Sequence, residues 1–351
     1  MDNNEQQPKH VRRVRYSGTH PKNFDEKYKE LQPEKYKEAV AKIIEDGKTP
    51  AGMHISICVN EILDFLQIKP GQVGLDATLG YGGHTQKMLE RLGTQGHIYA
   101  IDVDPIESKK TKARLENLGF TQDMLTVKLL NFSDIDKLSK DVGKFDFVLA
   151  DLGLSSMQID NPKRGFTYKY EGPLDLRMNP NKGISAAERL KNISQPQLEG
   201  MLDENADEPY ALEISRAIIG KIKRKIPIET TTALRETIEE ALSFLPANTR
   251  KDLIKKSCQR TFQALRIDVN GEFEALFDFL EKLPDVLCKG GRVAILTFHS
   301  GEDRFVKKSF KRFFSDGIYS DIAKDVIRPS AQECFNNSRA HSAKLRWAIK
   351  A

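Results

Sequence analysis

A glycine-rich turn after an apolar run is the first place where the residue types of this chain indicate ligand binding. Gly80, Gly82 and Gly83 fall within four positions, between an apolar run that starts at Val73 and an amphipathic stretch. Glycine has no side chain, so such a turn lets backbone N–H groups and a helix N-terminus come close to a bound molecule. Asp102 follows Gly80 by 22 residues. In nucleotide-binding α/β folds, an acid about 20 residues after the turn meets the ribose hydroxyls.

The spacing of the turn also indicates which kind of nucleotide ligand fits. Thr85 stands where the dinucleotide-binding fingerprint has its third glycine, which argues against a cofactor that carries a pyrophosphate. A nucleoside without a pyrophosphate fits the spacing better, and S-adenosylmethionine is the commonest cofactor of that kind. His84 either contributes to this site or simply hydrogen-bonds the turn that carries it.

A second polar motif, Asp151-Leu152-Gly153-Leu154-Ser155-Ser156, directly follows another apolar run. Enzymes that methylate amines place a short polar motif here, so that oxygen atoms accept hydrogen bonds from the target amine. An amine conjugated to a ring is a poor nucleophile, so an acceptor that orients its N–H and offsets developing positive charge lowers the barrier. Asp151 and Ser155 are therefore candidate catalytic residues. The alternative is that Asp151 caps the turn that follows it.

Mixed charges and aromatic residues occupy a loop just beyond this motif. Arg164 and Phe166, followed by Asp175 and Arg177, are candidates for holding an RNA phosphate and a stacked base. The alternative for Asp175 and Arg177 is a surface ion pair, and the residue types alone do not decide between the two.

His299 follows a third apolar run, which ends at Phe298. We expect it at the same edge of the fold, where it would orient the substrate or transfer a proton. The alternative is a structural histidine, which is the more common role for a lone histidine.

The elements that must position these residues alternate between strands and helices. We expect extended segments at 73–79, 98–103, 125–130 and 145–150, and helices at 57–66, 85–92, 105–118 and 135–138. Repeated strand–helix units of this length predict a parallel, doubly wound α/β sheet. Ligands of such sheets bind beyond the carboxyl ends of the strands, so one crevice should be lined by Gly80, Asp102, Phe132 and Asp151.

Residues 159–254 interrupt the alternation and show no strong strand pattern. Two capping boxes, Ser185-x-x-Glu188 and Ser194-x-x-Gln197, mark helix starts in this segment. We therefore predict an inserted all-helical domain here. The cations at 221–225 suit a helix dipole as well as RNA contact. After the insertion we expect a helix at 273–287, a strand at 293–298, a helix at 303–314 and a last strand at 344–349.

The overall composition limits the class of protein. The chain has 351 residues, of which 39% are apolar and 30% charged, enough for a sizeable core. Lys plus Arg total 55 against 50 acids, so any RNA-binding surface must be a local patch. No apolar stretch approaches the ~18 residues of a membrane span, and no signal region is evident. The four cysteines are far apart, so we expect neither disulfides nor a metal site, and a cytoplasmic location.

Residues 1–50 form a basic, partly helical N-terminal extension in this scheme. Within it, positions 1–22 carry five cations against two acids: Lys9, Arg12, Arg13, Arg15 and Lys22, with Asp2 and Glu5. The simplest expectation is a solvated tail, and the alternative is a basic arm on RNA phosphates. Residues 51–158 and 255–351 would then form the cofactor-binding domain, and 159–254 a helical domain for substrate recognition.

Seven strings of residues in register carry a family resemblance. They are Asp76-Ala77-Thr78-Leu79-Gly80-x-Gly82-Gly83-His84, Ile101-Asp102-x-Asp104, Asp151-Leu152-Gly153-x-Ser155-Ser156-x-Gln158-x-Asp160, Arg164-Gly165-Phe166, Gly172-Pro173-Leu174-Asp175-x-Arg177-Met178, Thr261-Phe262-Gln263-Ala264-Leu265-Arg266-Ile267-x-Val269-Asn270 and Phe298-His299-Ser300-x-Glu302-Asp303-Arg304. In these strings, which span about residues 54–347, the chain resembles the ribosomal RNA small-subunit methyltransferase H (MraW) family.

The resemblance implies a Rossmann-like class I methyltransferase sheet with an all-helical domain inserted after the fourth strand. It implies direct methylation of the N4 amine of a cytidine in the decoding centre of 16S rRNA, with the small ribosomal subunit as partner. It also implies that S-adenosylmethionine is bound at Gly82, Gly83, His84, Asp102, Phe132, Asp151 and Gln158. Whether the protein acts as a monomer or a homodimer is left open.

The chain departs from the family pattern at three places. Gly301 replaces the usual leucine, Ser56 stands where a proline is common, and the basic leader is longer, as in a second, divergent branch. These departures bear on the target nucleotide more than on the chemistry. Two rival functions are a DNA amino-methyltransferase, which usually carries a Pro-Pro-aromatic motif in place of Leu152-Gly153-Leu154, and a non-catalytic S-adenosylmethionine-binding ribosome assembly factor.

Overall fold

The computed structural model describes residues 56–351. The expectations for the N-terminal extension, residues 1–50, lie outside these described residues. Within 56–351, no helix is both long enough and apolar enough to cross a membrane.

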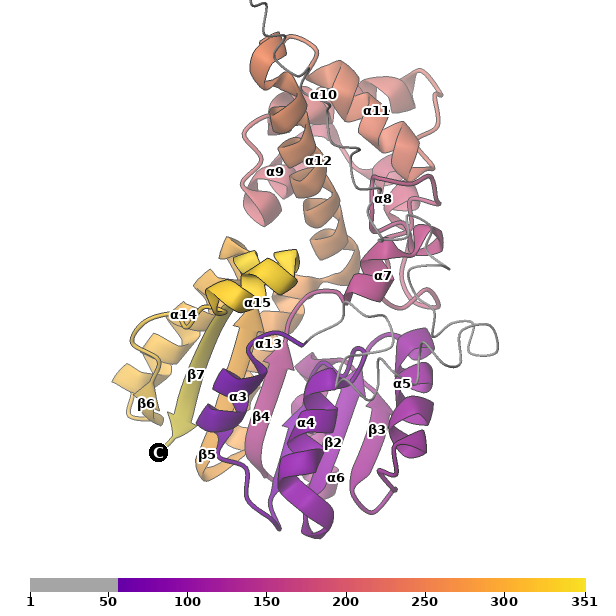
Figure 1. Cartoon of the computed structure of the whole chain (residues 1–351). Helices are drawn as coiled ribbons and strands as arrows, with labels where there is room; N and C mark the ends of the chain where they lie inside the picture. Colours follow the sequence, from indigo (N-terminus) through magenta and orange to yellow (C-terminus); the bar gives the residue numbers. More distant parts are fainter. Residues whose placement is uncertain (1–55) are drawn as a thin grey trace, which may run out of the picture. The chain divides into compact units, whose positions relative to one another are not determined.

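A seven-stranded sheet forms the centre of the described chain (Figure 1). Its strands lie in the order β3-β2-β1-β4-β5-β7-β6. The first five run parallel to their neighbours, and β7 runs antiparallel to both β5 and β6. The bounds are β1 Val73–Asp76, β2 His97–Asp102, β3 Leu125–Leu129, β4 Phe145–Asp151, β5 Leu287–Thr297, β6 Tyr319–Ile322 and β7 Lys344–Lys350.

The predicted doubly wound α/β sheet is confirmed, although three strands differ from expectation. Strand β5 begins at Leu287, six residues before its expected start at 293. The first strand ends at Asp76, three residues before the predicted end, because the Asp76 side chain accepts the Thr78 N–H and starts a turn. The short strand β6 was not predicted, since only Tyr319 of its four residues is buried. The antiparallel pair of β6 and β7 closes one edge of an otherwise parallel sheet.

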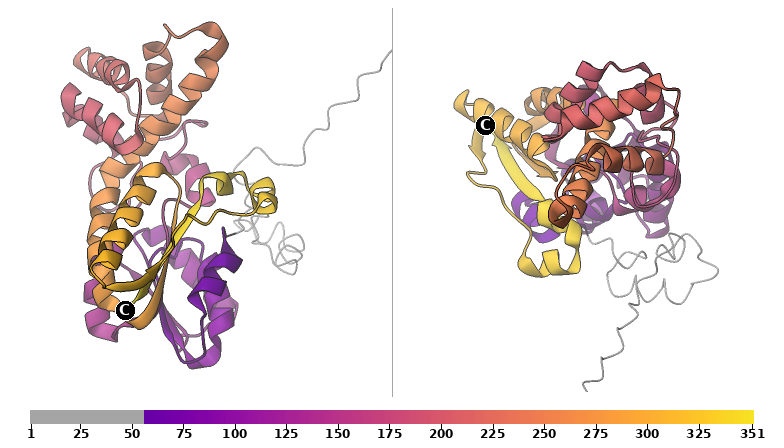
Figure 2. Two further views of the ribbon diagram at one scale, coloured as in Figure 1. Left: turned by 90° about the vertical axis from the view of Figure 1, so that its left-hand side faces the viewer. Right: turned by 90° about the horizontal axis from the view of Figure 1, so that it is seen from above.

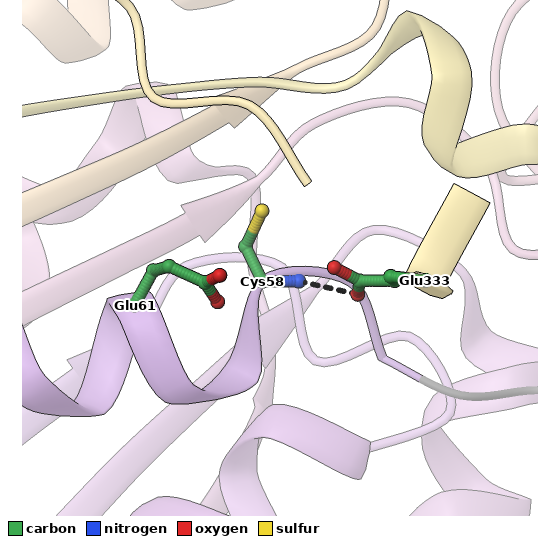
Figure 3. Close-up of side chains that lie close together, drawn as sticks. All are labelled: Cys58, Glu61 and Glu333. Atoms are coloured by element: carbon green, nitrogen blue, oxygen red, sulfur yellow. Dashed lines mark hydrogen bonds between the residues drawn. The ribbon is translucent and has the colours of Figure 1, made fainter. Parts of the chain in front are cut away.

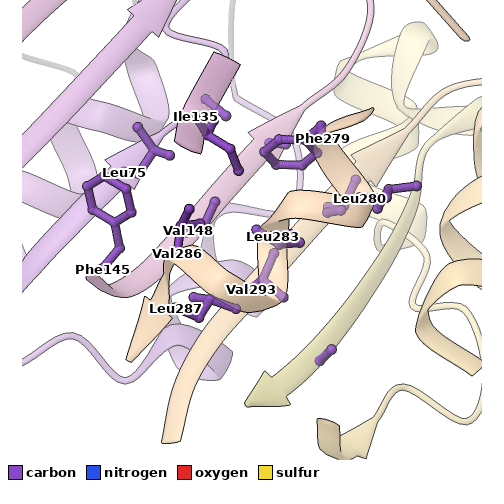
Figure 4. Close-up of a cluster of buried hydrophobic side chains, with 14 of the residues drawn as sticks. Leu75, Ile135, Phe145, Val148, Phe279, Leu280, Leu283, Val286, Leu287 and Val293 are labelled. Carbon is purple, nitrogen blue, oxygen red and sulfur yellow. The ribbon is translucent and has the colours of Figure 1, made fainter. Parts of the chain in front are cut away.

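Helices cover both faces of the sheet (Figures 1 and 2). One buried apolar cluster joins the strands to α3 Val59–Leu66, α4 Gly83–Leu92 and α5 Pro105–Asn117. A second joins them to α6 Ile135–Val142, α13 Glu272–Val286 and α14 Ser300–Ser315. Figure 4 shows the second cluster, in which α13 lies against the strands.

Successive residues of the central strands explain the two clusters. On β4, Phe147 and Leu149 belong to the α3–α4 side, whereas Val148 and Ala150 belong to the α13 side. Side chains alternate between the faces of a strand, so a continuous apolar run is what a strand covered on both faces requires.

A helical segment follows β4 and packs around its own apolar cluster, which includes Leu198, Ile214, Ile218 and Leu234. Both predicted capping boxes are present, at Ser185 and Ser194. The helices are α7 Ser156–Asp160, α8 Ala186–Asn192, α9 Gln195–Ala206, α10 Ala211–Lys223, α11 Thr231–Ala241 and α12 Ala247–Asn270.

The long helix α12 carries the chain from this segment back towards the sheet (Figure 1). The boundary expected between residues 254 and 255 falls inside this continuous helix of 24 residues. The division into domains at 158/159 and 254/255 stays a prediction. The remaining short elements are α15 Ala331–Asn336 and the 3-10 turns Gly93–Gln95, Phe132–Asp134, Pro162–Arg164 and Ser338–Ser342.

Candidate active site

A cavity of about 730 Å³ lies at the carboxyl ends of the parallel strands. Eleven of the fourteen predicted site residues line it: Gly80, Gly82, Gly83, His84, Asp102, Phe132, Asp151, Ser155, Gln158, Phe166 and His299. Arg164, Asp175 and Arg177 are not among the lining residues. The strand ends thus bring together residues that are more than 200 positions apart, as expected for a doubly wound sheet.

The glycine turn forms one wall of this cavity. Gly80 and Gly82 have φ values of +49° and +76°, a left-handed conformation that residues with a side chain rarely adopt. A Cβ atom on Gly83 would lie 2.1 Å from Ser56 Oγ. Gly82 is the N-cap of α4 and provides no side-chain cap, so the N–H groups of the first turn need other partners. The turn is therefore a suitable cradle for a polar ligand.

Asp102 is held in place beside this turn. Its Oδ2 atom accepts the Gly80 N–H at 2.7 Å, and its Oδ1 atom accepts the Asp104 N–H at 2.8 Å. Burial raises the pKa of the Asp102 carboxyl to about 6, although these two hydrogen bonds lower it. A carboxylate oxygen has two lone pairs, so each oxygen can still accept a hydrogen bond from a ribose hydroxyl.

Asp151 ends β4 on the opposite side of the turn. Its backbone N–H donates to Thr78 Oγ1 at 2.6 Å, which fixes the position of the strand end. Its Oδ1 atom is buried and has no hydrogen-bond partner among the described residues. Burial raises the pKa of the Asp151 carboxyl to about 6; charged His84 would lower it, and the acids Asp76 and Glu302 add to the rise. An unpaired buried oxygen on a residue that lines a cavity calls for a hydrogen-bond partner, which a ligand can supply.

His84 links the turn to Asp151. Its Nδ1 atom lies 3.5 Å from Asp151 Oδ2, and its Nε2 atom lies 3.0 Å from the carbonyl oxygen of Ile57. The ring is buried in the first turn of α4. Its side chain therefore bonds the segment before α3 and faces Asp151.

Ser155 and Gln158 bond each other in a capping box at the start of α7. The Gln158 amide also donates to Asp104 Oδ2 at 2.8 Å. Both residues line the cavity. However, the Ser155 hydroxyl oxygen already accepts the Gln158 N–H, and the Gln158 side-chain oxygen already accepts the Ser155 N–H. The spacing Ser155-x-x-Gln158 is the same signal that predicted two other helix starts, so the cap was detectable in the sequence. Their catalytic and cofactor-binding roles stay predictions.

Asp104 is a buried residue whose contacts the sequence alone did not reveal. Its side chain is fully buried, and Oδ2 lies 2.8 Å from Arg164 Nη1. Arg164 also donates to the carbonyl oxygens of Arg177 and Met178. These contacts engage the Arg164 guanidinium in the protein and favour a structural role over a phosphate contact. The signal was present, because Asp104 follows Asp102 in one of the strings that carry the family resemblance.

Asp175 and Arg177 form the ion pair that the sequence left as an alternative, with Arg177 Nε 2.6 Å from Asp175 Oδ1. A second Arg177 nitrogen donates to Asp175 Oδ2 at 2.9 Å, which makes the contact bidentate. Phe166, by contrast, lines the cavity together with Tyr168 and Phe262. The latter two rings pack edge to face with centroids 5.8 Å apart. This aromatic wall is a surface on which a nucleobase could stack.

His299 caps the N-terminus of α14. Its Nδ1 atom accepts the Glu302 N–H at 3.4 Å, and its Nε2 atom lies 3.1 Å from Glu302 Oε1. Burial raises the pKa of Glu302, but the hydrogen bond and charge of His299 outweigh this, so the pKa lies below its usual value. The catalytic role of His299 stays a prediction, and its visible role is to order the end of β5.

Cys58, Glu61 and Glu333 lie close together where the start of α3 meets α15 (Figure 3). The Glu333 carboxylate accepts the Cys58 N–H at 2.8 Å, which ties the segment before α3 to α15. Burial raises the pKa of the Cys58 thiol to about 12, which disfavours the thiolate that a metal would need. The contact matters for the cavity because the neighbouring residues Ser56 and Ile57 line it.

A parallel sheet closed by an antiparallel β7, with a glycine turn, an acid after β2 and an acid after β4 around one cavity, defines a class I methyltransferase. Its methyl donor is S-adenosylmethionine, and the residues present fit this nucleoside. A Cβ atom on Gly82 or Gly83 would collide with Thr111 or Ser56, so only glycines hold the turn in this shape, and each oxygen of Asp102 keeps a lone pair for a ribose hydroxyl.

The chain belongs to the MraW methylase family, whose model matches residues 51–351. It is 68% identical to ribosomal RNA small subunit methyltransferase H 2 of Alkaliphilus metalliredigens, over 100% of both chains. It is 68% identical to ribosomal RNA small subunit methyltransferase H 1 of Lachnoclostridium phytofermentans, over 99% of this chain and 94% of the relative. The identity is 38% with ribosomal RNA small subunit methyltransferase H of Koribacter versatilis, over 87% of this chain and 99% of the relative.

Proposed function

We propose that this enzyme methylates the exocyclic N4 amine of a cytidine in the RNA of the small ribosomal subunit, in the cytoplasm. The names of its relatives support the RNA as substrate. The observation that carries the choice of an amine is Asp151, which lines the cavity and whose buried Oδ1 atom has no hydrogen-bond partner among the described residues. A carboxylate oxygen in that position accepts a hydrogen bond and cannot donate one when ionised, so it suits a target that carries a proton, such as an exocyclic amine, over an unprotonated ring nitrogen.

The two sides of the cavity have different tasks in this proposal. Gly82, Gly83 and Asp102 hold S-adenosylmethionine, which supplies an electrophilic methyl group when bound. The aromatic wall of Phe166, Tyr168 and Phe262 receives the base. A cytidine in folded RNA has to leave its stack to enter such a cavity, and aromatic rings compensate part of the lost stacking.

Asp151 accepts a hydrogen bond from the target amine at Oδ1. This contact orients the nitrogen lone pair and offsets the positive charge that develops on nitrogen as it is methylated. Ordered donors and acceptors of this kind typically change rates by about 10²–10³.

The test is nucleoside mass spectrometry on RNA from small-subunit particles incubated with the purified protein and isotope-labelled S-adenosylmethionine. We expect labelled N4-methylcytidine, at a rate higher on particles than on a short oligonucleotide of the same sequence. The variant Asp151→Asn should lose about 10²-fold or more of this rate while retaining the cofactor site. Label in another nucleoside, or full turnover by the variant, would contradict the proposal.

A further inference from the structure

The contacts of His84 fix where its protons lie. Nε2 lies 3.0 Å from the carbonyl oxygen of Ile57. A carbonyl oxygen can only accept a hydrogen bond, so Nε2 must carry a proton. In the neutral ring Nδ1 then carries a lone pair. The Glu333 carboxylate bonds the adjacent Cys58 N–H at 2.8 Å, so this carbonyl is held from a separate part of the chain.

That lone pair faces a carboxylate. Nδ1 lies 3.5 Å from Asp151 Oδ2, so an acceptor opposes an acceptor unless a proton lies between them. His299 shows the opposite arrangement. Its Nδ1 accepts the Glu302 N–H, so its Nε2 carries the proton and lies 3.1 Å from Glu302 Oε1, close enough for a charge contact but without hydrogen-bond geometry. Of these two cavity histidines, only His84 needs an added proton before its Nδ1 atom and the neighbouring carboxylate oxygen can form a hydrogen bond.

We propose that His84 and Asp151 act as one proton acceptor, which takes the proton that the target amine loses and holds it between Oδ2 and Nδ1. The proposal rests on the proposed function for the identity of the amine. The amine N–H bond breaks and its electron pair stays on nitrogen, while the proton bonds to Asp151 Oδ1. A half-turn of the carboxyl about its Cβ–Cγ bond then brings this proton to face His84 Nδ1. The charge of the pair changes from −1 to zero. His84 is thus a positioning residue that acts through Asp151.

The groups around the pair favour uptake of a proton. Asp76 of β1 is buried and accepts the Thr85 hydroxyl at 2.6 Å, and Glu302 of α14 is buried on the other side. Both raise the pKa of the Asp151 carboxyl, and the Cys58 thiol is a further titratable group near it. A charged His84 lowers that pKa. The pair as a whole nevertheless binds its first proton more readily than Asp151 alone, because the proton has two sites and a hydrogen bond between them.

The first test is independent of activity. The full chain, labelled with ¹⁵N in its histidines, is titrated by NMR without cofactor, and His84 is assigned by its absence from His84→Asn. We expect the tautomer with the proton on Nε2 at high pH, and a change in the ring shifts that is shared with the titration of the Asp151 carboxyl near pH 6. This shared step should disappear in Asp151→Asn. A proton on Nδ1 at high pH, or identical ring shifts in wild type and Asp151→Asn, would overturn the proposal.

The second test is the pH dependence of single-turnover methyl transfer. The wild-type rate should rise with pH through about 6 and then level off, because the pair must be free to accept a proton. In His84→Asn the proton acceptor is weaker. The pH at which the rate rises should therefore be lower, and the constant rate at high pH should fall by about 10²-fold. If His84 has a purely structural role, its replacement should not change the pH at which the rate rises, and that result would refute the proposal.

His97→Asn is the matched control for both experiments. His97 starts β2, at the end of the strand remote from the cavity, and hydrogen-bonds Thr126 and the Asp123 carbonyl. Its replacement should change neither the pH at which the rate rises nor the constant rate at high pH. If the wild-type protein forms no N4-methylcytidine but the shared titration is present, the proposed function is wrong, whereas the sharing of a proton by His84 and Asp151 is confirmed. If the product forms and the shared titration is absent, only the pair fails.

Discussion

The buried contact between Asp104 and Arg164 gives a prediction whose size follows from the structure. The two charged atoms lie 2.8 Å apart, and the side chains are 0% and 8% exposed. At an effective dielectric constant of about 20, their attraction is about 6 kcal/mol. Removing both ions from water costs several kcal/mol each, so the pair itself adds little net stability. Breaking it is a different matter, because one charge is then left buried alone.

We expect Arg164→Met to lower the free energy of unfolding by about 3–5 kcal/mol, because the Asp104 carboxylate loses its counter-charge. Asp104→Asn keeps the helix cap, since Oδ1 accepts the N–H groups of Ile106 and Glu107 and asparagine caps equally well. When both changes are combined, the loss should be smaller than the sum of the single losses by about 2 kcal/mol or more.

The assay is urea unfolding, followed by the fluorescence of Trp347, which stacks on Phe65 with ring centroids 4.7 Å apart. Lys87→Met is the matched control. Lys87 and Glu90 are also 2.8 Å apart, but their side chains are 42% exposed, so the expected loss is about 0.2–1 kcal/mol. If Arg164→Met costs no more than Lys87→Met, burial does not set the strength of this contact and the reasoning is refuted.

Three further predictions concern the sheet, a cap and the cofactor. Gly74→Ala should cost about 1–3 kcal/mol or more, because the new Cβ would lie 2.1 Å from the buried Phe147 ring, and Phe147→Leu should restore part of the thermal stability. Ser185→Ala should lower the free energy of unfolding by about 1 kcal/mol in urea titrations, through loss of the cap on α8. S-adenosylmethionine affinity, measured by calorimetry, should fall as pH drops through about 6, because the Asp102 carboxyl becomes protonated there and accepts ribose hydroxyls less well. This pH dependence should vanish in Asp102→Asn.

The strands and helices that carry the cavity were predictable because each is a continuous apolar run or a periodic stretch. The residues at the strand ends, Gly80, Asp102 and Asp151, follow from the topology alone, since parallel strands bring their carboxyl ends to one edge. The edge strand β6 escaped prediction because only one of its four residues is buried, which leaves no apolar run to detect.

The contacts of individual side chains were harder to foresee. Arg164 has the same sequence features whether it meets a phosphate or a buried acid, and only the fold shows Asp104 beside it. The pairing of His84 with Asp151 joins residues 67 positions apart, and its meaning depends on a third contact, from Nε2 to the Ile57 carbonyl. Such a set of directed contacts has no periodicity, so no local pattern predicts it.

The contacts that the sequence did not predict together form a physical link between the end of β2, where Asp102 lies, and the helical segment. Asp104 lies two residues from Asp102 and binds Arg164, whose guanidinium holds the carbonyl oxygen of Met178 at 2.7 Å. The Met178 N–H donates to the side-chain oxygen of Asn270, at the end of α12. The side-chain nitrogen of Asn270 in turn donates to the carbonyl oxygen of Leu176.

Leu176 has a φ value of +63° and is fully buried. A left-handed leucine costs about 1–3 kcal/mol and persists only where the surroundings over-determine it. Leu176 and Met178 also line the cavity. The cavity wall at Leu176 and Met178 is therefore held by the same chain of contacts that starts beside Asp102. If Asp102 binds the ribose as predicted, a change at Asp104 or Asn270 should alter cofactor affinity and substrate binding together.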